Sequence, residues 1–395
     1  MTDSHDKAQK NLKYTLLFTF FVIALLTNVI GAVTNILIKE YSLSLGDAGL
    51  ITLSFFAAYG LASLPAGVLA HKYGYKIIYA TGVLLMTFGS LFFALVSTFN
   101  MLLMMSFIAG IGVTIIQVSI NPLVQQAGAK KDYPRNLNIA QSLFGIGSFL
   151  APLVIMQLVA KDISWRYFYF LIVALSAIVF LSATKIKVQK KAKDVFTIKS
   201  ILIHFKDVSV ISSFIALFFY VGVEMGVAVW LITYFETIRG IAPHTGAYLL
   251  SFYWLLLAIG RYLGGHLLKT HTPKTLVTTF SILGAISLAL ALFGNTTHSI
   301  IFLPMVGFSC SVLFPTIYSV TIENQKSGHS VVSGILWTAV IGGAIIPYLI
   351  GITADAYGLT AGLSILFISF LVIFLKGLSI KRTHADIEDA GPDAI

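Results

Sequence analysis

The sequence predicts an all-α membrane protein in which twelve transmembrane helices form two pseudo-symmetric six-helix bundles. Its 395 residues are 57% hydrophobic and only 11% charged, whereas soluble globular domains are about 45–50% apolar and about 25% charged. Apolar runs of about 20 residues, the length that crosses a bilayer as a helix, recur along the chain. A long basic segment separates six of these runs from the other six.

Each predicted helix is a run of mainly apolar residues between charged or turn-forming segments. The first run is longer than the apolar core of a signal peptide, roughly 7–15 residues, so we expect it to remain in the mature protein. The predicted helices are 14–38, 47–70, 76–97, 100–126, 137–160, 166–184, 210–235, 245–268, 275–294, 298–321, 330–353 and 359–379.

Lysine and arginine distinguish the two sides of the membrane. Counted over alternate loops, 22 lie on the side that carries both termini, and four lie on the other side: Lys39, Lys161, Arg166 and Arg239. Because basic loops stay in the cytoplasm, we expect a multi-pass protein of a bacterial-type inner (plasma) membrane with both termini cytoplasmic. These loops account for the net charge of +10, so membrane lipid is an expected partner and nucleic acid is not.

The chain divides into two repeated halves. We predict an N-terminal six-helix bundle at 1–184, a basic cytoplasmic linker at 185–209, a C-terminal six-helix bundle at 210–379 and a cytoplasmic tail at 380–395. Four residues of the second helix recur 197 positions later in the eighth: Gly49, Ser54, Phe55 and Gly67 as Gly246, Ser251, Phe252 and Gly264. The segment from Gly147 to Pro152 likewise matches Gly342 to Pro347. Repeated halves are typical of secondary transporters, which hold the solute between them.

Glu224 lies about midway along the seventh predicted helix. An ionisable residue at that depth costs roughly 2.5 kcal/mol or more and marks an ion or solute pathway by default. Burial favours the neutral form of a carboxyl group, so Glu224 is the predicted proton-coupling residue. The alternative is a glutamate that only holds helices together by hydrogen bonds.

A polar stripe runs along the fourth predicted helix. Gln117 and Asn121, together with Thr114 and Gln125, lie on one helical face, and Pro122 frees a backbone carbonyl beside them. Amides both donate and accept hydrogen bonds, so this stripe suits hydroxyl recognition; the alternative is hydrogen bonding between helices. The full set of predicted substrate-binding residues is Asn28, Asn35, Gln117, Asn121, Gln141, Tyr253, Trp254 and Trp337.

Several motifs resemble those of the major facilitator superfamily. GVLAHKYGYK at 67–76 resembles its loop signature, with His71 where that signature carries an acid. QVSINPLVQQAG, YVGVE and FPTIYS resemble the fucose, glucose and galactose permease branch. The resemblance extends from the first to the twelfth helix and implies a sugar site between the halves with coupling to protons. It places Gln117, Asn121, Gln141 and Glu224 at matching positions.

Four polar positions of that branch fall on apolar or small residues here. The asparagine–aspartate pair of the first helix falls on Ile30 and Gly31, and the asparagines of the fifth and tenth helices fall on Phe144 and Cys310. Because a buried hydroxyl without a partner costs about 1–3 kcal/mol, these changes favour a solute less hydrophilic than a hexose, such as a deoxy or acylated sugar.

The sequence therefore predicts an alternating-access secondary transporter, a symporter of a sugar-like small solute with a proton or sodium. The alternatives are a proton-coupled exporter of amphiphilic compounds and a non-transporting membrane receptor. We expect no enzyme activity, because no cluster of acids, histidines or nucleophiles lies at a membrane face. With one cysteine, Cys310, and no histidines at ligand spacing, we expect no metal site and no cofactor. We expect a monomer.

Overall fold

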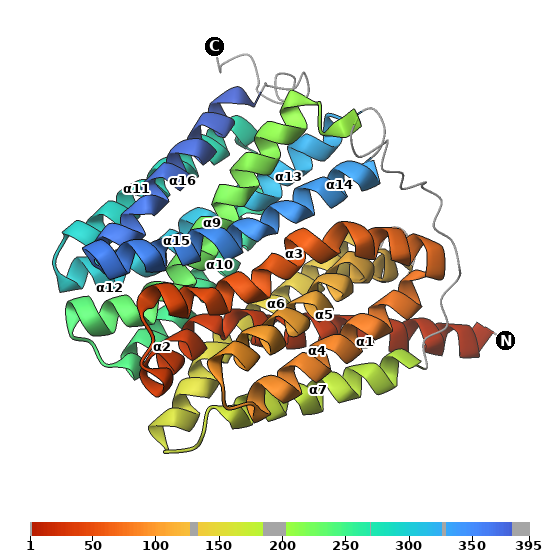
Figure 1. The fold of residues 1–395 in the computed structure, drawn as a ribbon. Coiled ribbons are helices and arrows are strands. Elements are labelled where there is room, and N and C mark those ends of the chain that lie inside the picture. Colours follow the sequence, from red (N-terminus) through yellow and green to blue (C-terminus); the bar gives the residue numbers. More distant parts are fainter. Residues whose placement is uncertain (1, 127–132, 185–202, 269, 326–328, 381–395) are drawn as a thin grey trace, which may run out of the picture.

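The computed structural model describes residues 2–126, 133–184, 203–268, 270–325 and 329–380. Within these residues, twelve spans are long and apolar enough to cross a membrane, and they correspond one to one with the predicted helices (Figure 1). Most of the predicted linker (185–202) and nearly all of the predicted tail (381–395) lie outside the described residues.

The N-terminal bundle contains the first six spans (red to yellow-green in Figure 1). Its helices are α1 (Thr2–Asn28), α2 (Ile30–Tyr41), α3 (Leu45–Tyr73), α4 (Tyr75–Leu95), α5 (Phe99–Gln126), α6 (Tyr133–Ala160) and α7 (Arg166–Thr184). Gly74 joins α3 to α4 with a φ of 95°, a value that suits glycine because it has no Cβ. The corner between these two spans therefore needs only one residue.

The C-terminal bundle contains the last six spans (green to blue in Figure 1). Its helices are α9 (Val208–Arg239), α10 (Pro243–Leu267), α11 (Pro273–Phe293), α12 (Thr296–Cys310), α13 (Leu313–Glu323), α14 (His329–Thr338), α15 (Gly342–Tyr357) and α16 (Leu359–Ser379), with the 3₁₀ segment η2 (Ala339–Ile341) between α14 and α15. Helix α9 starts two residues before its predicted start.

Asp207 caps the start of α9. One carboxylate oxygen accepts from the backbone N–H of Ser209 at 2.7 Å and the other from the amide of Gln325 at 3.2 Å. Partial burial acts to raise the pKa of Asp207, but these hydrogen bonds outweigh it and hold the pKa below its usual value. The cap thus ties the start of the seventh span to the end of the tenth.

Three spans are interrupted where the sequence predicts single helices. The α-helix of the first span is interrupted at Val29 and that of the tenth at Ser311 and Val312. In the eleventh span the α-helix changes to the 3₁₀ helix η2. A 3₁₀ stretch inside a helix often marks a hinge. Helix α5, by contrast, continues through Pro122. The predicted polar stripe therefore lies on an unbroken helix.

The two bundles are structural repeats. A Cβ added to Gly147 in α6 would lie 2.7 Å from the carbonyl oxygen of Phe21 in α1. A Cβ added to its motif equivalent, Gly342 in α15, would lie even closer to the carbonyl oxygen of Phe218 in α9. Phe218 follows Phe21 by the same 197 residues that separate the repeated positions of the second and eighth helices. Each bundle therefore packs its fifth span against its first span in the same way.

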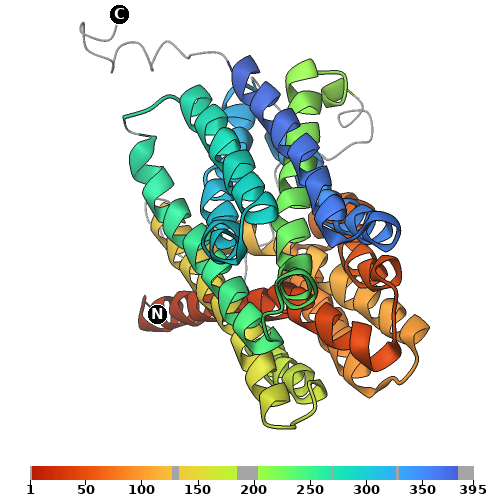
Figure 2. The same ribbon diagram turned by 90° about the vertical axis from the view of Figure 1, so that its left-hand side faces the viewer.

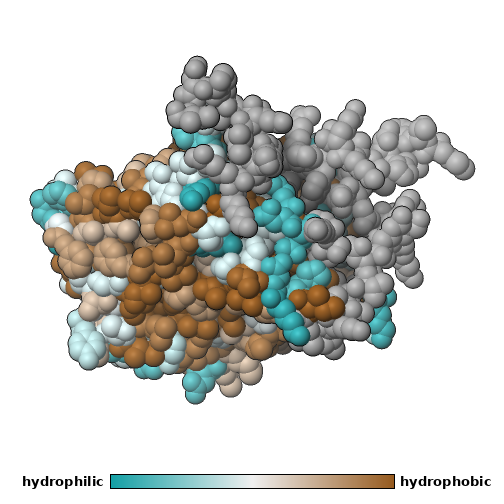
Figure 3. Space-filling model, turned by 90° about the horizontal axis from the view of Figure 1, so that it is seen from above, coloured by the Kyte–Doolittle hydropathy of each residue, from teal (hydrophilic) through white to brown (hydrophobic). Residues whose placement is uncertain are grey.

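Because the chain has an even number of spans, α16 ends on the same side of the membrane on which α1 begins. We call this side the terminal face and the opposite side the far face. The outer surface between them carries exposed apolar side chains such as Leu61, Leu181 and Leu371, and Figure 3 shows a broad apolar surface. Soluble monomers rarely expose apolar patches of this extent, so this surface suits contact with lipid.

The bundles meet mainly along three pairs of spans: α3 with α15 and the adjoining η2 and α14, α6 with α10, and α2 with α9 (Figure 2). At the centre, Gly31 of α2 packs directly against the backbone of Ala228 in α9. Ala228 follows Gly31 by 197 residues, so this crossing lies on the axis that relates the repeats. We call the surface between the bundles the seam.

Hydrogen bonds close the seam on the far-face side of this crossing. The Nζ of Lys39 contacts Glu236 at 2.5 Å, and the amide of Gln157 donates to the hydroxyl of Tyr248 at 3.0 Å. Toward the terminal face the ribbons of α3 and α14 diverge (Figure 1). The structure is thus closed at the far face.

Candidate functional site

Glu224 forms an ion pair in the middle of the C-terminal bundle. Its Oε1 lies 3.1 Å from Nη2 of Arg261 on α10, and the two side chains are 14% and 30% exposed, respectively. The hydroxyl of Tyr253, also on α10, donates to the backbone carbonyl of Glu224 at 3.0 Å. A charge this far inside a membrane span is tolerated when it is paired. Arg261 supplies the partner.

Both members of the pair are next to the seam. Glu224 lies one helical turn from Ala228, the residue that meets Gly31 of the other bundle. Arg261 is on the same face of α10 as Ala258, which lies 3.2 Å from a Cβ built on Gly145 of α6. The ion pair is therefore on the terminal side of two contacts between the bundles.

Three buried polar atoms on the helices around the pair lack hydrogen-bond partners: Oγ1 of Thr27, Nε1 of Trp254 and Nε of Arg261. The hydroxyl of Tyr220 is turned toward the pair, because it interacts with Glu224 and Arg261. Tyr220 precedes Glu224 by one turn, and Thr27 precedes Gly31 by one turn. A buried polar group left without a partner costs about 1–3 kcal/mol, and a cluster of such groups suits a polar ligand that supplies the missing hydrogen bonds.

The predicted amides of α5 keep their hydrogen-bonding capacity. Gln117 is partly buried and makes no hydrogen bond to another described residue, and the Oδ1 of Asn121 is buried without a partner. The repeat offset of 197 makes Phe314 and Tyr318 of α13 their equivalents. The rings of Phe314 and Tyr318 lie 5.7 and 6.4 Å from the ring of Trp337. Amides in one bundle thus correspond to aromatic rings in the other.

Gln141 of α6 is exposed. It lies one turn from Gly145 on the face that meets α10, so it flanks the seam from the side opposite Arg261. Trp254 precedes Arg261 by seven residues on the same face of α10 and is buried. Gln141 and Trp254 thus each lie one turn from the contact of Gly145 with Ala258, in different bundles.

The two asparagines of the first span lie elsewhere. Asn28 donates to the hydroxyl of Ser148 at 2.7 Å, within the N-terminal bundle. Asn35 donates to Glu236 at 2.9 Å and to Thr233 at 3.3 Å across the closed part of the seam. In this conformation both amides already have protein partners. Tyr253, bonded to the backbone of α9, is occupied in the same way.

Sequence reasoning missed Arg261, Tyr220 and Thr27. Arg261 is 37 residues from Glu224 and toward the terminal end of α10, a place where an arginine can also extend to the membrane surface. One signal was present: Trp254 and Arg261 are seven residues apart and therefore share a helical face. The side chain of Gln125 lies outside the described part of the structure.

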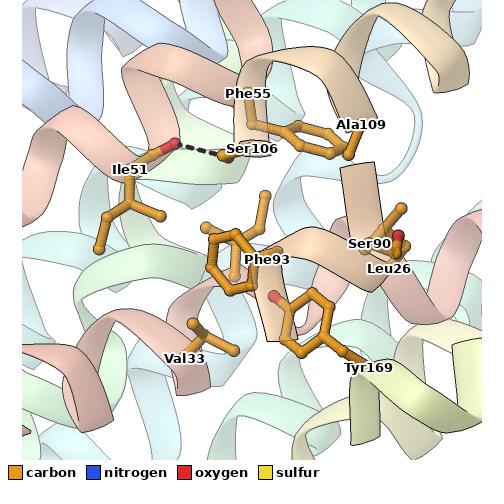
Figure 4. A pocket seen from close by; sticks show the side chains of 10 residues that line it. Leu26, Val33, Ile51, Phe55, Ser90, Phe93, Ser106, Ala109 and Tyr169 are labelled. Carbon is orange, nitrogen blue, oxygen red and sulfur yellow. Dashed lines mark hydrogen bonds between the residues drawn. The ribbon is translucent and has the colours of Figure 1, made fainter. Parts of the chain in front are cut away.

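An enclosed cavity lies inside the N-terminal bundle, away from this pair (Figure 4). Its wall is mainly apolar and includes Phe55 and Phe93, and Ser90 and Tyr169 also line it. It has room for about one water molecule. A sugar does not fit there, so the seam remains the candidate solute site.

Comparisons with known proteins extend over most of the chain. A family model described as Major Facilitator Superfamily matches residues 16–347. A glucose/galactose transporter of Brucella abortus biovar 1 (strain 9-941) is 27% identical, over 95% of this chain and 96% of the relative. The L-fucose-proton symporter of Escherichia coli (strain K12) is 23% identical, over 86% of each chain.

A crystal structure of the Escherichia coli fucose:proton symporter has the same fold. It matches this structure with a TM-score of 0.69 and 23% sequence identity, covering 94% of this chain and 98% of the other. The match includes both bundles, so the two proteins share the complete twelve-helix architecture.

Proposed function

This chain belongs to the major facilitator superfamily, and we propose that it is an alternating-access transporter that couples proton entry to the uptake of a sugar-like solute. The observation that carries the proposal is the Glu224–Arg261 pair within the C-terminal bundle, on the terminal side of the crossing of Gly31 with Ala228. It places a group that can bind a proton beside polar atoms that lack partners. The names of two relatives, a glucose/galactose transporter and an L-fucose-proton symporter, support a sugar and a proton.

Glu224 is under two opposing influences. Burial favours its neutral, protonated form, whereas the guanidinium of Arg261 favours the carboxylate. Proton uptake therefore weakens the ion pair and frees donors of Arg261. In our proposal those donors then bind solute hydroxyls, so that proton and solute stabilise the same loaded state.

The solute is held between unlike surfaces. Gln117, Asn121 and Gln141 in the N-terminal bundle both donate and accept hydrogen bonds, which suits hydroxyl groups. Trp254 and Trp337 in the C-terminal bundle offer flat apolar faces and an indole N–H. Unpartnered polar groups on both sides of the seam favour a polar solute over the amphiphilic compound of an exporter.

The proposed orientation places both termini in the cytoplasm, as the distribution of basic residues predicts. The far face is then outside the cell, and in our proposal its closure corresponds to the inward-facing state. In the cycle, the far-face contacts open, Glu224 takes up a proton, the solute binds, and the bundles rock to the arrangement seen here. Asn35 acts in this cycle as part of the far-face closure and not as a solute ligand.

Uptake by purified protein in liposomes tests the function. Radiolabelled glucose, galactose and fucose are offered with an inward proton gradient, with protein-free liposomes as the control. We expect accumulation of at least one sugar above its external concentration and loss of accumulation when a protonophore is added. A sugar that binds without entering would support a receptor instead, and uptake indifferent to the protonophore would exclude proton coupling.

A further inference from the structure

The N-terminus of α3 is bound by a residue of the opposite bundle. The backbone N–H groups of Leu45 and Gly46 each donate to the carboxylate of Asp355, at the end of α15, at 2.7 Å. The first amides of a helix have no partner within it, and the side-chain hydroxyl of the N-cap residue Ser44 accepts from the amide of Asp47. Asp355 therefore completes the cap of α3 from across the seam.

Two features of the sequence fit this contact. A Cβ on Gly46 would lie 2.8 Å from Oδ2 of Asp355, so a side chain at position 46 would displace the carboxylate. The contact has no second copy in the repeat. The equivalent of Gly46, 197 residues later, is Pro243, which has no N–H, and the alignment of Gly147 with Gly342 makes Ala160 the equivalent of Asp355. The contact is thus a special feature of the α3–α15 side of the seam.

We propose that Asp355 is the latch of the far face, a positioning residue that sets how often this face opens during transport. In the closed state its carboxylate accepts two hydrogen bonds and lies at the positive end of the α3 dipole. Opening separates α3 from α15 and breaks both bonds. Because Asp355 is exposed, water can form hydrogen bonds with the separated groups. The latch therefore favours the closed over the open far face without preventing opening.

This inference rests on the alternating-access cycle proposed above, but its test needs no solute. Spin labels at Lys161→Cys and His244→Cys report the distance across the far face, since both positions are exposed and flank the α6–α10 contact. Cys310 is buried, so the introduced thiols are the accessible ones.

We expect Asp355→Asn to raise the ratio of long to short label distances roughly fivefold, because the amide keeps one acceptor and turns a donor toward the α3 amides. Gly46→Ala should shift the ratio in the same direction by displacing the carboxylate. Asp47→Asn is the matched control: its side chain is an exposed acid of the same helix turn, and the substitution should leave the distances unchanged.

The proposal is overturned if Asp355→Asn and Gly46→Ala give the wild-type distance distribution, or if Asp47→Asn shifts it equally. Failure to transport any sugar would contradict the proposed function but would leave these distances interpretable. A shifted distribution in a protein that transports none of the tested sugars would therefore separate the two conclusions.

Discussion

Glu224 and Arg261 show how a residue's role depends on its partner. The position of Glu224 in the middle of a span was sufficient to single it out as a candidate, because charges at that depth are rare. Its partner could not be predicted in the same way. The 3.1 Å contact depends on the relative rotation of α9 and α10, which apolar periodicity within each helix leaves undetermined.

The ion pair makes a prediction about stability. Replacing Arg261 by Gln leaves the carboxylate without its counter-charge, and breaking a fully buried pair costs about 3–5 kcal/mol. The 30% exposure of Arg261 reduces that cost, so we expect a loss of about 1–3 kcal/mol. Thermal unfolding in detergent measures it.

The control for this experiment is the double variant Arg261→Gln with Glu224→Gln, which removes both charges. It should recover a large part of the lost stability, since no unpaired charge remains. Equal melting temperatures for the single and double variants would contradict the pairing.

Gln117 offers a second prediction at this scale. Gln117→Leu removes a donor and an acceptor from the proposed solute surface, and a lost hydrogen bond in a buried site is worth about 1–3 kcal/mol, or roughly 5–150-fold in affinity. We expect weaker solute binding by titration calorimetry with little change in thermal stability, because Gln117 makes no hydrogen bond to another described residue. Unaltered affinity would make Gln117 a structural residue only.

At the scale of the helices, hydropathy predicted every span, but not the interruptions at Val29, at Ser311 and Val312, and in η2. Length and apolar content determine whether a segment crosses the membrane. The interruptions instead reflect packing against other helices, as where Ser311 and Val312 meet the small residues Gly260 and Gly264 of α10. Asn35 illustrates the same limit: the sequence predicted it as a substrate-binding residue, but its hydrogen-bond partners come from α9.

Close helix packing gives a prediction for Gly342. A Cβ there would overlap the carbonyl oxygen of Phe218, so Gly342→Ala must push α15 away from α9 and should cost about 1–3 kcal/mol of stability. Gly265→Ala is the control, because nothing lies within 4 Å of its added Cβ. The control should be neutral or stabilising by up to about 1 kcal/mol, since alanine favours helix. Similar melting temperatures for the two variants would contradict the packing described here.

At the scale of the whole molecule, the repeated motifs predicted two equivalent bundles, and the contacts of Gly147 and Gly342 show that equivalence in space. The conformation could not be predicted from them. A repeated sequence is compatible with closure at either face, and the choice depends on non-local contacts such as that of Lys39 with Glu236. The proposed functional residues lie where the repeat is broken: Glu224 corresponds to Thr27, and Asn121 to Tyr318.

The proton movement that accompanies solute entry is the most direct test of proton coupling through Glu224. Wild-type protein in lightly buffered liposomes, with no imposed gradient, should make the external medium more alkaline when a transported sugar is added, because each entering solute brings a proton with it. Glu224→Gln, which keeps the shape of the side chain but cannot exchange a proton, should still exchange labelled for unlabelled sugar yet produce no alkalinisation. Equal alkalinisation by the wild type and the Glu224→Gln variant would contradict the assignment of proton coupling to this residue.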